Sequence, residues 1–265
     1  MPYLRGFSTL GCAERTLPEI LALAVRHQLG AVEVRALGGR LDLPGYLKEK
    51  HGDPGQLAKE VASAPTCIVA LGTSLKLTEA TAAAREALLQ FVPWAEALRV
   101  PWLRVFDGDV KDGEGGLDRA AGTMAWWREL RARHQWQTNL MVETHDSLLS
   151  AAEIERFLAA APGTAVLWDA HHTWRRGGEP PATTWQVVGR HVVHVHVKDS
   201  IARPSARHPF TYVLPGDGEF PMGELRGILS REFGGVVSLE WERHWHPDLP
   251  ELEAALAAAA RSDWW

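Results

Sequence analysis

The sequence has 265 residues, of which 46% are hydrophobic and 23% charged, a composition typical of a globular protein with a large core. The formal net charge of −5 and the scarcity of Lys and Arg runs argue against a nucleic-acid partner, because binding a polyanion depends on clustered basic side chains. No signal-peptide pattern and no apolar stretch of about 18 residues is present, so we expect no membrane partner. The two cysteines, Cys12 and Cys67, have no metal-binding spacing, so we expect reduced thiols in a cytoplasmic protein.

Short apolar runs rich in β-branched residues recur along the chain, and each is followed by a longer stretch with helical spacing. Near-continuous apolar runs are typical of strands that are covered on both faces, as in parallel sheets. The eight predicted strands cover residues 4–9, 31–36, 66–70, 102–106, 140–144, 165–169, 192–197 and 236–241.

The segments between these runs carry helix signals. Residues 16–19 read TLPE, which combines an N-cap Thr, an early Pro and a Glu at the third helical position, and this first helix is predicted to end near Gly30. The remaining predicted helices cover residues 54–64, 78–98, 116–134, 147–160, 182–188, 222–232 and 250–261. We expect residues 38–54 to form either a lid over the active site or an ordinary surface loop.

Eight alternating strand and helix units of roughly 33 residues each match a (β/α)8 barrel, which commonly has about 250 residues. The competing fold is an open doubly wound sheet, which usually has fewer strands and often a glycine-rich phosphate loop after the first one. Residues 9–13 read TLGCA, without a GxGxxG pattern. The sequence therefore favours one barrel domain over residues 1–265, since no shift in composition marks a second domain.

Reactive residues of such barrels lie at the carboxyl ends of the strands. Four consecutive predicted strands end in carboxylates or imidazoles, separated each time by about one strand–helix unit. They provide Glu143, Asp169, the pair His194 and His196, and Glu240. The two histidines face the same side of their strand, so spacing alone leaves open which of them belongs with the carboxylates.

A cluster of buried carboxylates needs positive charge at its centre. Three carboxylates and one imidazole suit Mn²⁺ or Mg²⁺ and tolerate Co²⁺ or Zn²⁺, so the sequence predicts one divalent metal ion. The alternatives are structural. Glu143 or Glu240 could pair with an Arg or Lys at the barrel mouth, and Asp169 could cap the helix that follows it.

At these residues the chain resembles the sugar phosphate isomerase/epimerase family, the xylose isomerase-like TIM barrels. The resemblance covers nearly the whole chain and is carried by GFST at 6–9, AVEVR at 31–35, VETHD at 142–146, DAHH at 169–172, HVHVKD at 194–199, PGDG at 215–218 and SLEWE at 238–242. It implies that the metal ligands are Glu143, Asp169, His196 and Glu240, and so selects His196.

The resemblance also implies that His172, in the DxxH pattern, touches substrate, and that His145 and Lys198 lie at recurrent family positions. Two departures argue against an ordinary ketose 3-epimerase. Ala202 stands where those enzymes have an Arg, although the adjacent Arg203 could replace it, and Leu149 stands where they have a Glu.

For the ketose-type members the resemblance implies proton transfer next to a carbonyl through an enediolate. We expect Glu143 and Glu240 to be the acid/base pair, and Trp168 to line the substrate site or the core. The favoured hypothesis is a metal-dependent isomerase or epimerase of a small sugar or polyol. An inosose-type dehydratase on the same site and a non-catalytic binding barrel are the alternatives, and the zinc set of the endonuclease IV branch is incomplete.

The last two residues, Trp264 and Trp265, are apolar, and such side chains are unusual in water. We expect them to pack either on the barrel or on a neighbouring subunit of a homo-oligomer.

Overall fold

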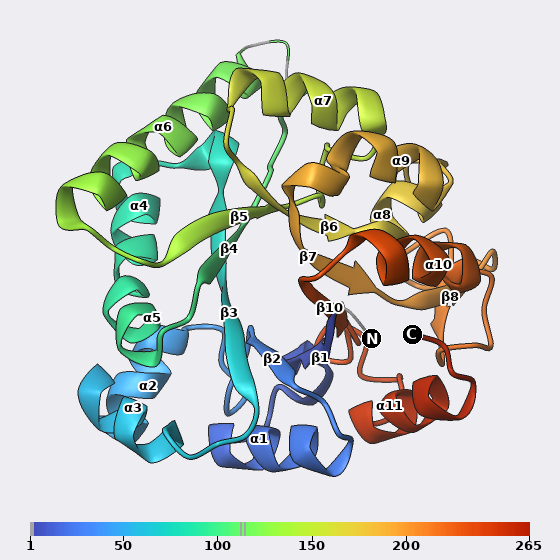
Figure 1. The fold of residues 1–265 in the computed structure, drawn as a ribbon, viewed down its shortest axis with the longest axis horizontal. Helices are drawn as coiled ribbons and strands as arrows, with labels where there is room; N and C mark the ends of the chain where they lie inside the picture. Colours follow the sequence, from blue (N-terminus) through green and yellow to red (C-terminus); the bar gives the residue numbers. More distant parts are fainter. Residues whose placement is uncertain (1–2, 112, 114) are drawn as a thin grey trace.

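A computed structural model describes residues 3–111, 113 and 115–265 of the chain. Within these residues, parallel strands close a barrel in the order β1-β10-β7-β6-β5-β4-β3-β2, with helices arranged around it (Figure 1). The predicted (β/α)8 barrel is therefore confirmed.

All eight predicted strands are present, and most of their ends lie within two residues of the prediction. The exception is β3, which continues well past residue 70 because its pairing with β4 resumes after an irregularity between Gly72 and Lys76. The barrel strands are β1 (Leu4–Ser8), β2 (Ala31–Val34), β3 (Cys67–Lys76), β4 (Trp102–Phe106), β5 (Asn139–Glu143), β6 (Ala165–Asp169), β7 (Val192–Val197) and β10 (Val236–Leu239).

The predicted helices are also present, with one division. The predicted helix 78–98 is two helices, because Pro93 lacks an N–H and its ring would clash with a carbonyl in a continuous helix. The helices in these places are α1 (Leu17–Arg26), α3 (Pro54–Val61), α4 (Ala82–Leu89), α5 (Val92–Leu98), α6 (Gly116–His134), α7 (Ala151–Ala160), α9 (Pro181–Val188), α10 (Met222–Glu232) and α11 (Leu252–Arg261). The predicted capping box at Thr16 and Glu19 is present.

Two helices and a two-stranded hairpin in the described part of the chain were not predicted. The segment expected to be a loop at 38–54 contains helix α2 (Leu43–His51), whose first turn is capped by Asp42 accepting from the Gly45 N–H at 3.1 Å. A short helix, α8 (Ala170–Arg175), follows β6 directly. Strands β8 (Asp199–Ile201) and β9 (Thr211–Val213) form an antiparallel hairpin after β7.

The apolar core has two parts. The larger part fills the space between the barrel and its helices. The smaller part consists of Ala70, Met141 and Leu167, which are fully buried inside the barrel. Trp264 and Trp265 are 7% and 3% exposed, and Trp264 packs near Phe220 with ring centroids 6.2 Å apart, so the pair packs on its own chain.

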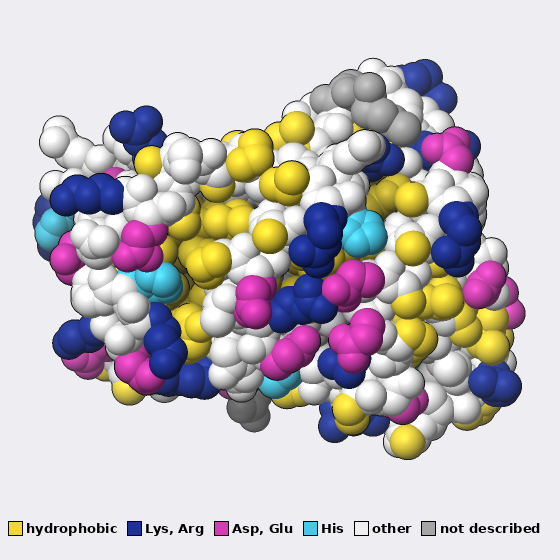
Figure 2. Space-filling view, turned by 90° about the horizontal axis from the view of Figure 1, so that it is seen from below, with side chains coloured by type: hydrophobic (Ala, Val, Ile, Leu, Met, Phe, Trp, Pro, Cys, Tyr) yellow, Lys and Arg dark blue, Asp and Glu magenta, His cyan; other side chains and the backbone are white. Residues whose placement is uncertain are grey.

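On the face shown in Figure 2, basic and acidic side chains lie interspersed between apolar patches. Among the helices in the described part of the chain, none combines the length and apolarity needed to cross a membrane. Both cysteines are free, Cys12 buried and Cys67 exposed.

Candidate metal centre

The four residues expected to hold a metal lie together at the mouth of the barrel. Glu143 ends β5, Asp169 ends β6, His196 lies in β7, and Glu240 directly follows β10. One possible ligand atom from each residue lies within 4.8 Å of the others. Nδ1 of His196 is 3.6 Å from Oε1 of Glu143 and 3.4 Å from Oε2 of Glu240.

Strand register produces this convergence. Asp169 is paired with His196 across β6 and β7, and Leu239 is paired with Val197 across β10 and β7. Because side chains alternate along a strand, His194 and His196 both point into the barrel. The structure brings His196, rather than His194, beside the carboxylates.

The donor set fits a divalent cation. Nδ1 of His196 is buried and lacks a hydrogen-bond partner among residues 3–111, 113 and 115–265, although it faces two carboxylates. A cation bound between the carboxylate oxygens would give this unpaired imidazole nitrogen a partner. Three carboxylates and one nitrogen suit Mn²⁺ or Mg²⁺ best among common ions.

Lys198 lies against the same carboxylates and is 1% exposed. Its Nζ atom is 2.8 Å from Oδ2 of Asp169 and 2.7 Å from Oε1 of Glu242, and it also contacts Glu240 directly. Asp169 has a further role, since its Oδ1 accepts from the His172 N–H at 2.8 Å and caps α8. Asp169 therefore caps a helix and Glu240 pairs with a Lys, as the structural alternatives proposed, and both residues also belong to the cluster.

Arg104 is a site residue that the sequence analysis did not identify. It lies in β4, is 1% exposed, and places Nε 3.1 Å from Oε2 of Glu143. Its guanidinium lies over the ring of Phe106 at 4.0 Å and donates to the Thr73 carbonyl at 2.9 Å. The sequence did hold a signal for Arg104, because it lies in the middle of an apolar strand. Burying a charged side chain there is costly unless the charge is paired.

These neighbours determine the protonation of the cluster. Burial opposes ionisation of Glu143, but the guanidinium of Arg104 and the imidazole of His196 together outweigh it and lower the pKa of Glu143 to about 2. For Glu240, burial is likewise outweighed by His196 and Lys198, which hold its pKa well below the ordinary value. Burial raises the pKa of Asp169 to about 6, against the effect of Lys198. Glu143 and Glu240 are thus anions at neutral pH, and Asp169 is the carboxylate that most readily takes a proton.

Two predicted substrate residues lie next to the cluster. His172 is 5% exposed, and its Nδ1 is 3.2 Å from Oδ2 of Asp169. The ring of His145 lies 5.1 Å from the ring of His172, and its Nδ1 is 2.8 Å from Oδ1 of Asp146. Glu143, His145 and His172 also form a compact group of possible ligands.

Two other predicted substrate residues do not join the cluster. Trp168 is fully buried, packs on Trp185 with ring centroids 5.7 Å apart, and donates from Nε1 to Oγ1 of Thr173 at 3.0 Å. Its side chain lies between barrel and helices because it alternates with the inward-facing Asp169, which agrees with the core position and not with the substrate-site position expected for it. Arg203 is exposed in the loop between β8 and β9, and the described part of the chain shows no ion pair between it and the carboxylates.

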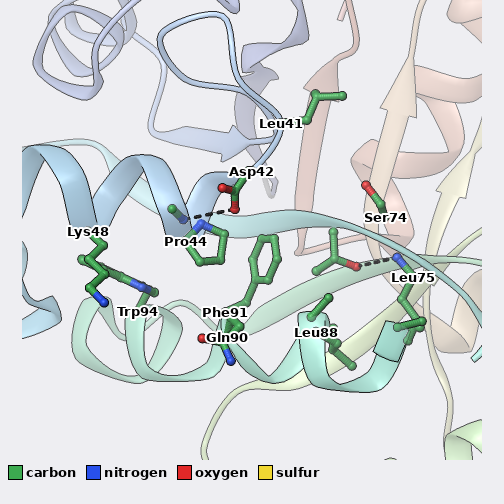
Figure 3. A pocket seen from close by; sticks show the side chains of 14 residues that line it. Leu41, Asp42, Pro44, Lys48, Ser74, Leu75, Leu88, Gln90, Phe91 and Trp94 are labelled. Carbon is green, nitrogen blue, oxygen red and sulfur yellow. Dashed lines mark hydrogen bonds between the residues drawn. The ribbon is translucent and has the colours of Figure 1, made fainter. Parts of the chain in front are cut away.

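A cavity of about 630 Å³ lies outside this cluster, between α2, the end of β3 and the helices α4 and α5 (Figure 3). Its walls are mainly apolar, including Leu75, Leu88, Phe91 and Trp94. The carboxylate of Asp42 on its edge is engaged in capping α2 (Figure 3). Because the ionisable groups gather at the barrel mouth instead, the barrel mouth is the candidate site.

A closed parallel barrel with ionisable residues at the carboxyl ends of its strands defines the TIM-barrel class. Within that class, the chain belongs to the xylose isomerase-like TIM barrel family, whose profile matches residues 21–264. A search of curated proteins gives no match.

Solved structures share the fold at low sequence identity. The probable 3-DHS dehydratase AsbF of Bacillus anthracis is 17% identical with a TM-score of 0.74, and the match covers 98% of this chain and 99% of that one. A xylose isomerase domain-containing protein of Salmonella typhimurium is 14% identical with a TM-score of 0.77, covering 99% and 97%. The 3-keto-D-glucoside 4-epimerase YcjR of E. coli is 12% identical with a TM-score of 0.70, covering 98% of each chain.

Proposed function

We propose that this protein is a divalent-metal-dependent isomerase or epimerase that moves a proton next to the carbonyl of a small sugar or polyol-derived ketone. The observation that carries the proposal is the convergence of Glu143 and Glu240 on Nδ1 of His196 from two strands that are not neighbours in the barrel. Residues 1–265 would act as one catalytic domain.

Glu143, Asp169, His196 and Glu240 would hold the metal ion. When bound, the ion would supply Lewis acidity to the carbonyl and neighbouring hydroxyl oxygens of the substrate. We assign proton removal and return to Glu143 and Glu240, because both are ionised at neutral pH and approach the centre from different sides of the barrel.

Three further residues would bind and orient the substrate. His145 and His172 lie beside the carboxylates, on the side of β5 and β6. Lys198 brings an ammonium group to the centre, and burial, which opposes its charge, is outweighed by Asp169 and Glu240, which raise its pKa well above the ordinary value. It would therefore stay charged and stabilise an oxyanion on the substrate.

The second candidate is a dehydratase that uses the same centre to expel water. Although burial lowers the pKa of His145, Asp146 and Glu143 raise it overall, so this imidazole beside the carboxylates can donate a proton to a departing hydroxyl, and this observation favours the alternative. The probable 3-DHS dehydratase AsbF also has this fold. The departures at Leu149 and Ala202 agree with a reaction other than ketose 3-epimerisation.

The first test is metal content by elemental analysis of the wild type beside a His196→Ala/Glu240→Gln double variant. We expect about one ion per wild-type chain and loss of that ion in the variant. Incubation with candidate ketones in D2O then separates the chemistries. Deuterium appearing next to the carbonyl supports isomerisation or epimerisation, whereas loss of water supports the dehydratase. A wild type that takes up no Mn²⁺, Co²⁺ or Zn²⁺ would refute both and favour a binding protein.

Glu143→Gln tests the acid/base assignment separately from the fold. The amide has almost the same shape but cannot accept the proton, so we expect deuterium uptake to fall by about 10²- to 10⁴-fold. Gln137→Glu, an exposed change on the loop before β5, is a matched control and should leave uptake unchanged. Equal uptake in Glu143→Gln and wild type would remove Glu143 from the mechanism.

A further inference from the structure

Glu33 is a fully buried carboxylate inside the barrel that the function proposed above does not use. It lies in β2, whereas His196 lies in β7, and β1 and β10 stand between these two strands in the barrel. The two side chains nevertheless meet across the barrel interior, where Oε2 of Glu33 is 2.6 Å from Nε2 of His196. A contact between residues 163 positions apart fixes the centre from the opposite wall.

The surroundings of Glu33 are unusual for a buried acid. Its ion pairs within the described ranges are with imidazoles, to His196 at 2.6 Å and to His194 at 3.5 Å. A buried carboxylate without a Lys or Arg partner is expensive, and an apolar side chain of similar volume would fill the same space at lower cost. Packing alone therefore does not account for Glu33.

The contact determines which ring nitrogen faces the centre. A neutral imidazole carries its hydrogen on one nitrogen and a lone pair on the other, and only the lone pair can bind a metal. With Nε2 donating to Glu33, the hydrogen is placed on Nε2 and the lone pair on Nδ1. Nδ1 is the atom that faces Glu143 and Glu240 at 3.6 and 3.4 Å.

We infer that Glu33 is the positioning residue of the metal centre: it fixes the orientation and tautomer of His196 and so makes Nδ1 the metal-binding atom. This inference rests on the proposed metal-dependent function. Glu33 does not touch the ion. It acts through His196, and carboxylates that hold a ligand histidine in this way strengthen metal binding by about 10- to 100-fold.

The neighbouring His194 shows the specificity of this contact. It points into the barrel from the same strand, yet its Nε2 is 2.7 Å from Oγ of Ser238 and 3.5 Å from Glu33. The carboxylate thus makes its short contact with one of two equivalent histidines in the HVHVKD motif.

The experiment measures the dissociation constant of Co²⁺ by its visible absorbance in four proteins: wild type, Glu33→Leu, Glu33→Gln and Ser238→Ala. We expect Glu33→Leu to bind Co²⁺ about 10- to 100-fold more weakly, with one ion still bound at saturation. Glu33→Gln should lie between, because its amide oxygen can still accept from Nε2. Ser238→Ala removes the partner of His194 and is the matched control, expected to bind within roughly threefold of wild type, since deletion of one neutral hydrogen bond has a modest effect.

Thermal unfolding of the metal-free proteins separates positioning from folding. A Glu33→Leu protein that unfolds near the wild-type temperature but binds Co²⁺ more weakly supports positioning, because a purely structural role would not change affinity alone. If the Leu variant does not fold, the isosteric Gln variant carries the test, and weaker binding than the Ser238→Ala control is expected.

Three results would overturn the inference, and they differ from one another. Equal Co²⁺ affinity in wild type and the Glu33 variants removes Glu33 from the centre and leaves the proposed function standing. Two ions per wild-type chain, with one lost in Glu33→Leu, would make Glu33 itself a ligand. A wild type that binds no ion removes the proposed function together with the inference.

Discussion

The two halves of the barrel mouth differ in the side chains that lie beneath the proposed metal ligands. On β5 and β6, the inward-facing residues one step below Glu143 and Asp169 are the apolar Met141 and Leu167. On β7 and β10, the corresponding positions below His196 and Glu240 are occupied by His194 and Ser238, which hydrogen-bond to each other at 2.7 Å.

The difference follows from the ligands above. Glu143 is paired with Arg104, and Asp169 is paired with Lys198. Because neither partner lies beneath its carboxylate, apolar side chains can pack there. An imidazole has a second nitrogen on its far edge, and that nitrogen needs a partner within the barrel. For His196 that partner is Glu33 of β2, which also lies 3.5 Å from His194, so polar side chains extend deeper into the barrel beneath His196 than beneath Glu143 and Asp169.

Metal removal should have the largest effect, because both halves meet at the ion. A chelator is expected to lower turnover by about a thousandfold or more, since a Lewis acid contributes several kcal/mol to the transition state. At a hundredfold excess over Kd, a bound ion stabilises the fold by about 2.7 kcal/mol, so the Tm should fall by roughly 5–10 °C. Calorimetry with and without chelator measures this change in Tm. An unchanged Tm would argue against an ion bound between the two halves of the barrel mouth.

Met141→Ala should destabilise the apolar half without affecting the ion. Truncating a fully buried side chain leaves a cavity, so we expect a loss of about 2–5 kcal/mol in the free energy of unfolding. Urea denaturation of the metal-free protein measures that loss. The Co²⁺ dissociation constant of the folded variant should equal that of the wild type. A weaker affinity would show that the apolar packing beneath Glu143 also positions the ligands.

Asp146→Asn tests a charge just beyond the apolar half. The hydrogen bond from His145, together with Lys76 at 3.2 Å, lowers the pKa of Asp146 from 3.8 to about 2. This stabilisation is complete above the unfolded pKa and is lost as the pH falls from about 3.8 towards 2. At pH 7 the variant should lose about 1–2 kcal/mol. Urea titrations from pH 7 to 3 check whether the difference narrows, and a constant difference would contradict the ionic origin.

Trp168→Phe should have the smallest effect on the metal centre, since Trp168 lies outside both halves. It removes the hydrogen bond to Thr173 and part of a fully buried ring, which together are expected to cost about 1–3 kcal/mol of stability. The values of kcat and KM should stay at those of wild type. A raised KM in a stable variant would restore the original assignment of Trp168 to the substrate site.

The sequence was sufficient for the barrel because each parallel strand is a local signal. A run such as residues 192–197 is apolar, β-branched and bounded by helix signals, and it forms β7 at the predicted residues. Helix α2 was missed because its Lys-rich, Gly-containing sequence has the composition of a loop, and only its Asp42–Pro44 start indicated a helix. The β8–β9 hairpin has strands of only three residues, which are too short to show a period.

For the candidate site, the sequence located the residues at strand ends and missed the partners within strands. Glu143, Asp169, Glu240 and the pair His194 and His196 follow from one rule about barrels, applied strand by strand, and the family resemblance then selected His196. Glu33 and Arg104 stand inside apolar strands, where a charge indicates a partner without identifying it. The partner of Glu33 lies across the barrel, and its identity depends on strand tilt and register, which only the folded structure supplies.

The barrel closes where β1 pairs with β10, the first strand in the chain with the last. During synthesis the chain emerges from its amino end, so β1 keeps an unpaired edge until residues 236–239 have left the ribosome. Glu240 arrives with that same strand. The barrel can therefore close, and the ligand set can be completed, only late in the synthesis of each chain. A translation product that ends before β10 would have neither a closed barrel nor Glu240.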